Sequence, residues 1–174
     1  MKNLLFTSTL FLIFNFSFAQ TKIENDLTRD GLKGKVSFYS ESKYDLVEKF
    51  GEIEKGGLNF KVTYKYDEKG NMIERNYYTT YGILENESKY KYDVKGNMIE
   101  ENYSAGEGSG KSKSTYKYDD KGNMIEENFY NDGGSLGYKS TYKYEFDATG
   151  NWIKKTFITD GKPEGLIERV IEYY

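Results

Sequence analysis

The sequence predicts an all-β protein, an antiparallel meander of tandem β-hairpins that forms a single extended sheet, twisted or coiled. Three observations lead to this fold class. A tyrosine-rich segment recurs at intervals of 26 residues, each copy places two alternating runs around a Gly-Asn turn, and Pro occurs only once. With 18 Tyr and 18 Gly but few Leu, Ile and Val, aromatic side chains must supply most of the buried surface.

The repeated segment is Tyr64–Glu74, which returns as Tyr90–Glu100 and as Tyr116–Glu126. A fourth copy begins at Tyr142, but its Asp-x-x-Gly-Asn core is shifted by two residues. We expect the hairpin repeats to span 60–85, 86–111, 112–137 and 138–165. An N-terminal cap over 32–59 and a closing strand over 166–174 complete the predicted single domain.

Each copy divides into two strands around a turn that begins at an aspartate. Asp67 at the first position and Gly70 at the fourth are typical of a type I turn followed by a left-handed glycine. Glycine enters that region without steric cost, so it should form a bulge that fixes the register. The predicted structural turn residues are Asp67, Gly70, Asn71, Asp93, Gly96, Asn97, Asp119, Gly122, Asn123, Asp147, Gly150 and Asn151. The connections at the other hairpin ends vary in sequence and are expected to be looser.

Pairing across this turn would place Tyr66 opposite Met72 and Tyr64 opposite Glu74, all on one face of the sheet. Copies of the repeat lie two strands apart, roughly 9.6 Å, so the tyrosines should form ladders. The opposite face is expected to be mostly charged, with a thin apolar line, and to carry Lys65, Ile73, Arg75 and Tyr77.

The aromatic ladder allows two interpretations. Its rings could stack on sugars while neighbouring polar groups bond the hydroxyls, or they could pack together as the core of the sheet. We favour packing, because an aromatic face of this size is rarely exposed in a soluble monomer. Trp152 is the best single candidate for a ligand contact and an equally good core residue. The candidate ligand-face residues are Tyr64, Tyr66, Tyr90, Tyr92, Tyr116, Tyr118, Tyr144 and Trp152.

Metal binding and catalysis find little support. The turn aspartates could bind calcium, but each turn offers one carboxylate, and Asp before Gly-Asn is what the turn itself requires. We therefore predict no metal and no cofactor. Without His or Cys, catalysis would fall to carboxylates, Lys, Tyr or Ser. The pairs Glu100–Glu101 and Glu126–Glu127 are adjacent in strands and should point to opposite faces, so we expect no enzyme.

The N-terminus indicates export. A basic start, an apolar run and a small-x-small site predict a signal peptide over 1–19, with an uncleaved anchor as the rival interpretation. A flexible leader should follow over 20–31. The chain has no Cys, which excludes a lipoprotein signal and any disulfide. Loss of Lys2 with the signal changes the formal charge from −3 to −4, so nucleic acid is not an expected partner. We predict a secreted or periplasmic protein.

The Tyr-x-Tyr-Asp-x-x-Gly-Asn cores resemble the YD repeats of the Rhs and wall-associated family over about residues 60 to 160. The segment Gly31–Val36 and the end of the signal are also similar to small secreted proteins of the Bacteroidota. In large Rhs proteins, the resemblance implies, such repeats wind a sheet into a shell around a toxin domain. Here the repeats are longer and few, and nothing after Asn151 has the length of a toxin domain, so the shell function does not carry over.

These observations together predict a non-enzymatic exported repeat protein, a structural or protein-interaction scaffold at the cell envelope. The alternative is a carbohydrate-binding module that uses the tyrosine and tryptophan face. A carboxylate-based, glycan-active enzyme is a second alternative. The expected partner is accordingly a protein or a glycan at the cell surface.

Overall fold

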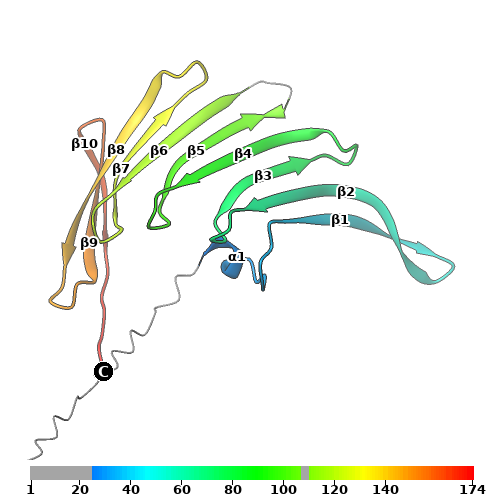
Figure 1. Ribbon diagram of the computed structural model, residues 1–174, viewed down its shortest axis with the longest axis horizontal. Helices are drawn as coiled ribbons and strands as arrows, with labels where there is room; N and C mark the ends of the chain where they lie inside the picture. The colour runs from blue at the N-terminus through cyan, green and yellow to red at the C-terminus, as the bar shows by residue number, and fades with distance from the viewer. Residues whose placement is uncertain (1–24, 107–109) are drawn as a thin grey trace, which may run out of the picture.

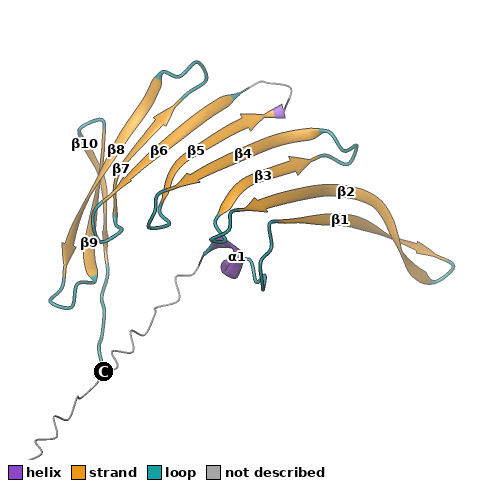
Figure 2. Ribbon diagram, in the orientation of Figure 1, coloured by secondary structure: helices purple, strands orange, loops and turns teal. Residues whose placement is uncertain are grey.

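The computed structural model describes residues 25–106 and 110–174, so the predicted signal peptide lies outside the described residues. They form one ten-stranded antiparallel sheet whose spatial order follows the chain order, together with a short helix, α1 (Asp26–Arg29) (Figures 1 and 2). The predicted all-β antiparallel meander is confirmed. Its strands are β1 (Phe38–Lys49), β2 (Glu52–Tyr66), β3 (Met72–Tyr78), β4 (Leu84–Tyr92), β5 (Met98–Ala105), β6 (Lys111–Tyr118), β7 (Met124–Tyr130), β8 (Leu136–Phe146), β9 (Trp152–Thr159) and β10 (Lys162–Glu168).

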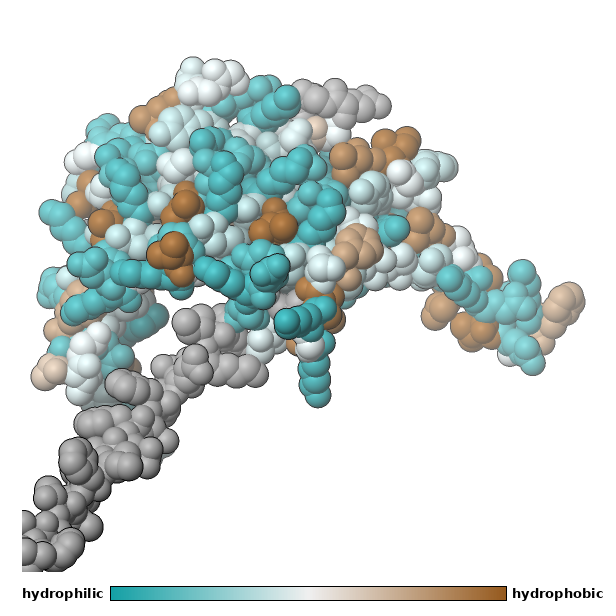
Figure 3. All heavy atoms as spheres, viewed as in Figure 1, coloured by the Kyte–Doolittle hydropathy of each residue, from teal (hydrophilic) through white to brown (hydrophobic). Residues whose placement is uncertain are grey.

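The sheet is open and strongly curved, and α1 lies on the inner side of the curve (Figure 1). The second half of β1 and the first half of β2 extend beyond the other strands as a two-stranded projection, within the range predicted as the N-terminal cap. At its tip Phe50 is fully exposed, and Leu46 and Ile53 are also exposed. Figure 3 shows hydrophobic residues gathered at this projection and scattered singly over the largely hydrophilic remainder of the visible face.

The aspartate turns share their backbone hydrogen bonds in all four repeats, and the asparagine-to-aspartate bond in the first three. In the first, the Asp67 carboxylate accepts hydrogen bonds from the backbone N–H of Lys69 and of Asn71, each at 2.9 Å. The Asn71 amide donates to the other carboxylate oxygen, also at 2.9 Å. The turn glycine is left-handed in every copy, with φ between 82° and 91°, at Gly70, Gly96, Gly122 and Gly150.

A second irregularity follows each turn and changes the predicted register. Tyr66 pairs with Met72 as expected, but Lys65 then pairs with Glu74, so Ile73 has no opposite residue. The same skip recurs at Ile99, Ile125 and Ile153. The predicted pairing of Tyr64 with Glu74 is therefore wrong, because a bulge residue moves every later residue of the strand to the other face.

The corrected register defines two faces. We call the face of Tyr64 and Tyr66 the tyrosine face; it also carries Arg75, which lies opposite Tyr64, and Tyr77, whose ring stacks on Phe60 at 5.3 Å. The prediction that Arg75 and Tyr77 lie on the opposite face is wrong for the same reason. That opposite face, which we call the charged face, carries alternating Lys, Glu, Thr and Asn.

Ion pairs and amide hydrogen bonds connect neighbouring strands on the charged face. Glu100 bridges Lys91 at 2.6 Å and Lys113 at 2.8 Å, and the Asn102 amide donates to it at 2.8 Å. Glu126 makes the equivalent contacts one repeat later. These neighbours hold the pKa of both carboxyls at about 2, chiefly through Lys113 for Glu100 and through Lys117 for Glu126.

The connections at the other hairpin ends are less variable than the sequence predicts. In the first, Gly82 N–H donates to Thr79 and Thr79 N–H to Ile83, which repeats the geometry of the aspartate turn. The segment from Asn131 to Ser135 does the same. The turn between β9 and β10 is instead a two-residue turn with positive φ at both central residues, a type typical of tight hairpins.

The two ends of the sheet carry short caps. α1 falls within the range 20–31 where the sequence predicts a flexible leader, and its side chains bond to the sheet. At the other end β10 spans Lys162–Glu168, so the strand predicted over 166–174 begins earlier and stops before residue 169. The tail beyond it lies across the last turn, where the Asn151 amide donates to the Tyr173 hydroxyl at 2.8 Å and that hydroxyl donates to Asp147.

Replacing Gly96 by Ala tests the turn. A Cβ there would meet only the Asn71 side-chain oxygen, at 4.0 Å, so the cost is that of forcing alanine to a φ of +90°. We expect a loss of about 1 kcal/mol or more in unfolding free energy. Urea denaturation measures it, with Gly57→Ala, which has open space and no positive φ, as the control. An unchanged midpoint for Gly96→Ala would contradict the turn assignment.

Acid should weaken the charged face. Because the folded-state pKa of Glu100 and of Glu126 is lowered to about 2, their contribution is complete above the ordinary value of 4.5 and is lost as pH falls toward 2. The double change to Gln should flatten the fall in unfolding free energy over this range, by about 0.2–1 kcal/mol for each ion pair. Urea titrations at several pH values measure this. Glu145→Gln, whose side chain is 66% exposed, is the control and should leave the slope unchanged.

Candidate ligand-binding face

The tyrosine face contains two rows of rings, one for each tyrosine of the repeated motif. In the row nearer the turns, the tyrosine hydroxyl of each repeat after the first donates to a methionine carbonyl of the preceding repeat at 2.8 Å. The bonds are Tyr92 to Met72, Tyr118 to Met98 and Tyr144 to Met124. These tyrosines therefore link neighbouring repeats. Burial also raises the pKa of each of these phenols.

The second row is formed by Tyr64, Tyr90, Tyr116 and Tyr142, and its rings are partly exposed. Three of its hydroxyls bond to carboxylates on the same face: Tyr64 donates to Glu41 at 3.4 Å, Tyr116 to Glu101 at 3.4 Å and Tyr142 to Glu127 at 2.7 Å. Burial raises the pKa of Tyr116 to about 12. This row presents both aromatic surface and polar groups to solvent.

A row of charged residues crosses the tyrosine face at one position of the repeat. It holds Arg75 on β3, Glu101 on β5, Glu127 on β7 and Lys155 on β9. Their 26-residue spacing in the first three repeats is visible in the sequence, but their face depends on the bulge. Lys155 lies 4.5 Å from the centre of the Tyr142 ring, and burial lowers its pKa.

The two inserted residues of the fourth repeat lie at the end of β8, which is 11 residues long. Phe146 lies opposite Trp152, and Tyr144 lies opposite Lys155. Trp152, the best predicted ligand contact, is partly covered: the Arg169 guanidinium lies 3.2 Å from the centre of its ring, and Tyr144 meets it edge-on at 6.0 Å. Its environment is that of a packed end residue.

The helix α1 closes part of the tyrosine face at the first repeats. The Asp26 carboxylate accepts hydrogen bonds from the Tyr92 hydroxyl and from the Met72 N–H, each at 2.8 Å. Asp30 accepts from the Tyr66 hydroxyl, and Tyr66 is only 4% exposed. The sequence offered little signal for these contacts, because a four-residue helix has no periodicity.

Asn25 docks the helix on the first aspartate turn. Its side-chain amide donates to the Lys69 carbonyl at 2.6 Å and lies directly against Gly70. Between later repeats the same place is taken by the turn asparagine of the preceding repeat, since the Asn71 oxygen faces Gly96. Asn25 therefore substitutes for the turn of a preceding repeat.

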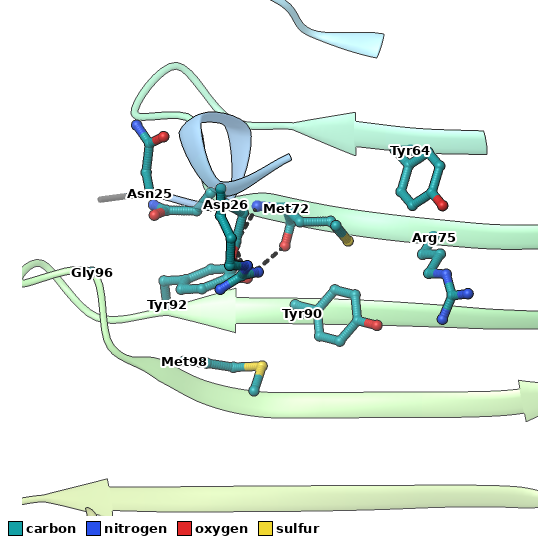
Figure 4. A pocket seen from close by; sticks show the side chains of 11 residues that line it. Asn25, Asp26, Tyr64, Met72, Arg75, Tyr90, Tyr92, Gly96 and Met98 are labelled. Carbon is teal, nitrogen blue, oxygen red and sulfur yellow. Dashed lines mark hydrogen bonds and ion pairs between the residues drawn. The ribbon is translucent and has the colours of Figure 1, made fainter. Parts of the chain in front are cut away.

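A cavity of about 540 Å³ lies between α1 and the first two repeats (Figure 4). Tyr64 on β2 and Tyr90 on β4 lie on either side of β3, and Arg75 extends from β3 between them. Arg29 reaches in from the helix and forms an ion pair with Asp26. Within residues 25–106 and 110–174, Arg75 has no ion pair and no side-chain hydrogen bond, and it is exposed.

The structure separates the adjacent carboxylates considered for catalysis. Glu100 lies on the charged face between two lysines, whereas Glu101 lies opposite Tyr90 on the tyrosine face. Glu126 and Glu127 separate in the same way.

The turn aspartates are occupied by hydrogen-bond donors, and the described residues contain no group of three or more acidic side chains placed to hold a metal ion. No helix in the described part of the chain is long and apolar enough to cross a membrane.

Comparison with known proteins identifies no family for this chain. No family model and no curated protein matches the sequence. Among solved structures, a chain in the crystal structure of TcdB2-TccC3-Cdc42 is similar, at 15% sequence identity and a TM-score of 0.44. The match covers 75% of this chain and 9% of that chain. A likeness at this level transfers neither a fold family nor a role.

Removing one hydroxyl tests the link between repeats. Tyr118→Phe leaves the Met98 carbonyl without its tyrosine donor, so we expect about 1 kcal/mol lower unfolding free energy. Tyr81→Phe is the matched control, because that ring is 86% exposed and its loss of a hydroxyl should be neutral. Thermal denaturation followed by circular dichroism compares them; equal melting temperatures for the two variants would reject the linking role.

Proposed function

We propose that the chain is a non-enzymatic exported scaffold that binds a partner at the cell envelope through its tyrosine face. The observation that carries this proposal is a row of partly exposed rings running in register with a row of charged side chains across an open, curved sheet. Rings beside polar groups provide both apolar contact and hydrogen bonding, as binding surfaces require.

The arrangement of the acidic groups supports a binding role over catalysis. Acid–base chemistry on a glycan needs two carboxyls converging on one bond. Here the adjacent pairs diverge to opposite faces, and Glu127 is engaged by the hydroxyls of Tyr142 and Tyr138. Export is supported by the N-terminal sequence, and a place among surface repeat proteins by the likeness of the turns to YD repeats.

Carbohydrate binding is the second candidate, and the pairing of the strands favours it. From β2 to β9 every strand is paired on both sides, so a peptide lying on the tyrosine face could not add to the sheet through its backbone. A sugar needs no such edge, since its ring can lie on a tyrosine and its hydroxyls can bond side chains.

A single exposed ring provides the test. Tyr103 lies on the tyrosine face opposite Ser88 and Ser112, is 39% exposed, and can be replaced by Ala with little loss of packing. Biolayer interferometry of the purified chain against cell-envelope fractions should show saturable binding that Tyr103→Ala weakens several-fold. Tyr81→Ala, an exposed ring in a turn, should bind like the wild type.

Two treatments of the envelope fraction separate the candidates. Loss of binding after periodate oxidation indicates a glycan, and loss after protease treatment indicates a protein. Equal binding by Tyr103→Ala and Tyr81→Ala, or no saturable binding to any fraction, would contradict the proposed function.

A further inference from the structure

We propose that the cavity between α1 and the first two repeats binds a carboxylate-bearing sugar unit, with Arg75 as the group that holds the carboxylate. This inference rests on the proposed function, because it takes the tyrosine face to be the binding surface. It goes further by assigning the ligand's charge, its class and the residue that recognises it.

Arg75 breaks the pattern of its own repeat position. The equivalent residues Glu101 and Glu127 each accept a hydrogen bond from a tyrosine of the following repeat. A guanidinium has no acceptor, so it cannot take the Tyr90 hydroxyl in the same way. The tyrosine-to-carboxylate bond of the later repeats is therefore not made at Arg75. Its positive charge faces the cavity without an acidic partner among the described residues.

The charges around the cavity favour an anion. Arg29 is neutralised by its ion pair with Asp26, so Arg75 contributes the net positive charge of the lining. The chain as a whole has a formal charge of −3. A local positive charge on an acidic protein favours a ligand with a single negative charge. The cation attracts the anion at one place, and the negative charge of the rest of the protein repels polyanions.

The groups around Arg75 indicate what the anion is attached to. A guanidinium matches a carboxylate through two parallel hydrogen bonds. The rings of Tyr64 and Tyr90 flank it (Figure 4) and offer apolar faces and hydroxyls to a sugar ring. A volume of about 540 Å³ lies within the range of small-ligand sites.

The next charge in the row limits the ligand further. Glu101 lies two strands beyond Arg75, roughly 9.6 Å along the sheet, and its negative charge would repel a second carboxylate there. A glycan in which an acidic unit is followed by a neutral one fits this pattern better than a continuous polyanion.

Isothermal titration calorimetry with two disaccharides of the same size tests the proposal: cellobiouronic acid, which carries one carboxylate, and neutral cellobiose. We expect the acid to bind the full purified chain more tightly than cellobiose. Arg75→Gln should weaken binding of the acid by about tenfold or more, since a hydrogen bond to a charged group contributes about 1.5–3 kcal/mol. Binding of cellobiose should not change.

Lys143→Gln is the matched control, because it removes one exposed positive charge from the charged face, where Lys143 lies opposite Thr156. It should bind the acid like the wild type, and circular dichroism should show both variants folded. Equal binding of the two disaccharides, equal binding by Arg75→Gln and the wild type, or no binding of either sugar would overturn the assignment.

An acidic peptide tests whether the cavity binds a peptide instead of a sugar. If N-acetyl-Gly-Glu-Gly-amide binds with the same dependence on Arg75 and the disaccharide does not, the cavity recognises a peptide and the sugar assignment is wrong. The proposed function is tested independently of this site. Envelope binding that depends on Tyr103 but not on Arg75 would support the binding role of the tyrosine face and reject the assignment of Arg75.

Discussion

The carboxylate at the head of each aspartate turn is the interaction on which the architecture depends. It accepts hydrogen bonds from two backbone N–H groups in all four turns, and from an asparagine amide in the first three, around one glycine in the left-handed region. These bonds fix where the chain reverses. The isoleucine bulge follows at a constant distance, so the turn also sets which residues reach each face. Hydrogen bonds and strand register thus determine the position of each turn and the face of each residue. The sheet forms with only two buried hydrophobic residues, Val62 and Tyr66, among those described.

Stacked repeats leave an incomplete contact at each end, and this protein fills both with segments unlike the repeat. Asn25 takes the place of a preceding turn at one end, and Tyr173 adds a hydroxyl to the last turn at the other. The first filling also creates the cavity, since α1 stands over the sheet where no further repeat is present. Completing the array and forming a binding pocket are thus served by the same few residues.

The sequence was sufficient to predict the hairpin array, because the 26-residue spacing and the Asp-x-x-Gly-Asn turns depend on local chemistry alone. It was not sufficient for the faces. Ile73 fits a continuous alternating strand as well as it fits a bulge, and that one ambiguity placed Arg75 and Tyr77 on the wrong side. The capping contacts of Asp26 join residues 46 and 66 positions apart, which no local pattern reveals. The candidate tyrosines were identified, but which row links repeats and which row is open depended on the register.

Each linking tyrosine reaches only to the methionine of the repeat before it, so no bond of this kind spans more than one neighbour. The number of repeats could therefore change without altering the contacts between neighbouring repeats. Duplication or loss of one 26-residue unit would extend or shorten the ring-lined face by a fixed step and leave the two end caps intact. The span of the tyrosine face would therefore change in whole repeats, and the charge at the position of Arg75, Glu101 and Glu127 could differ from one repeat to the next.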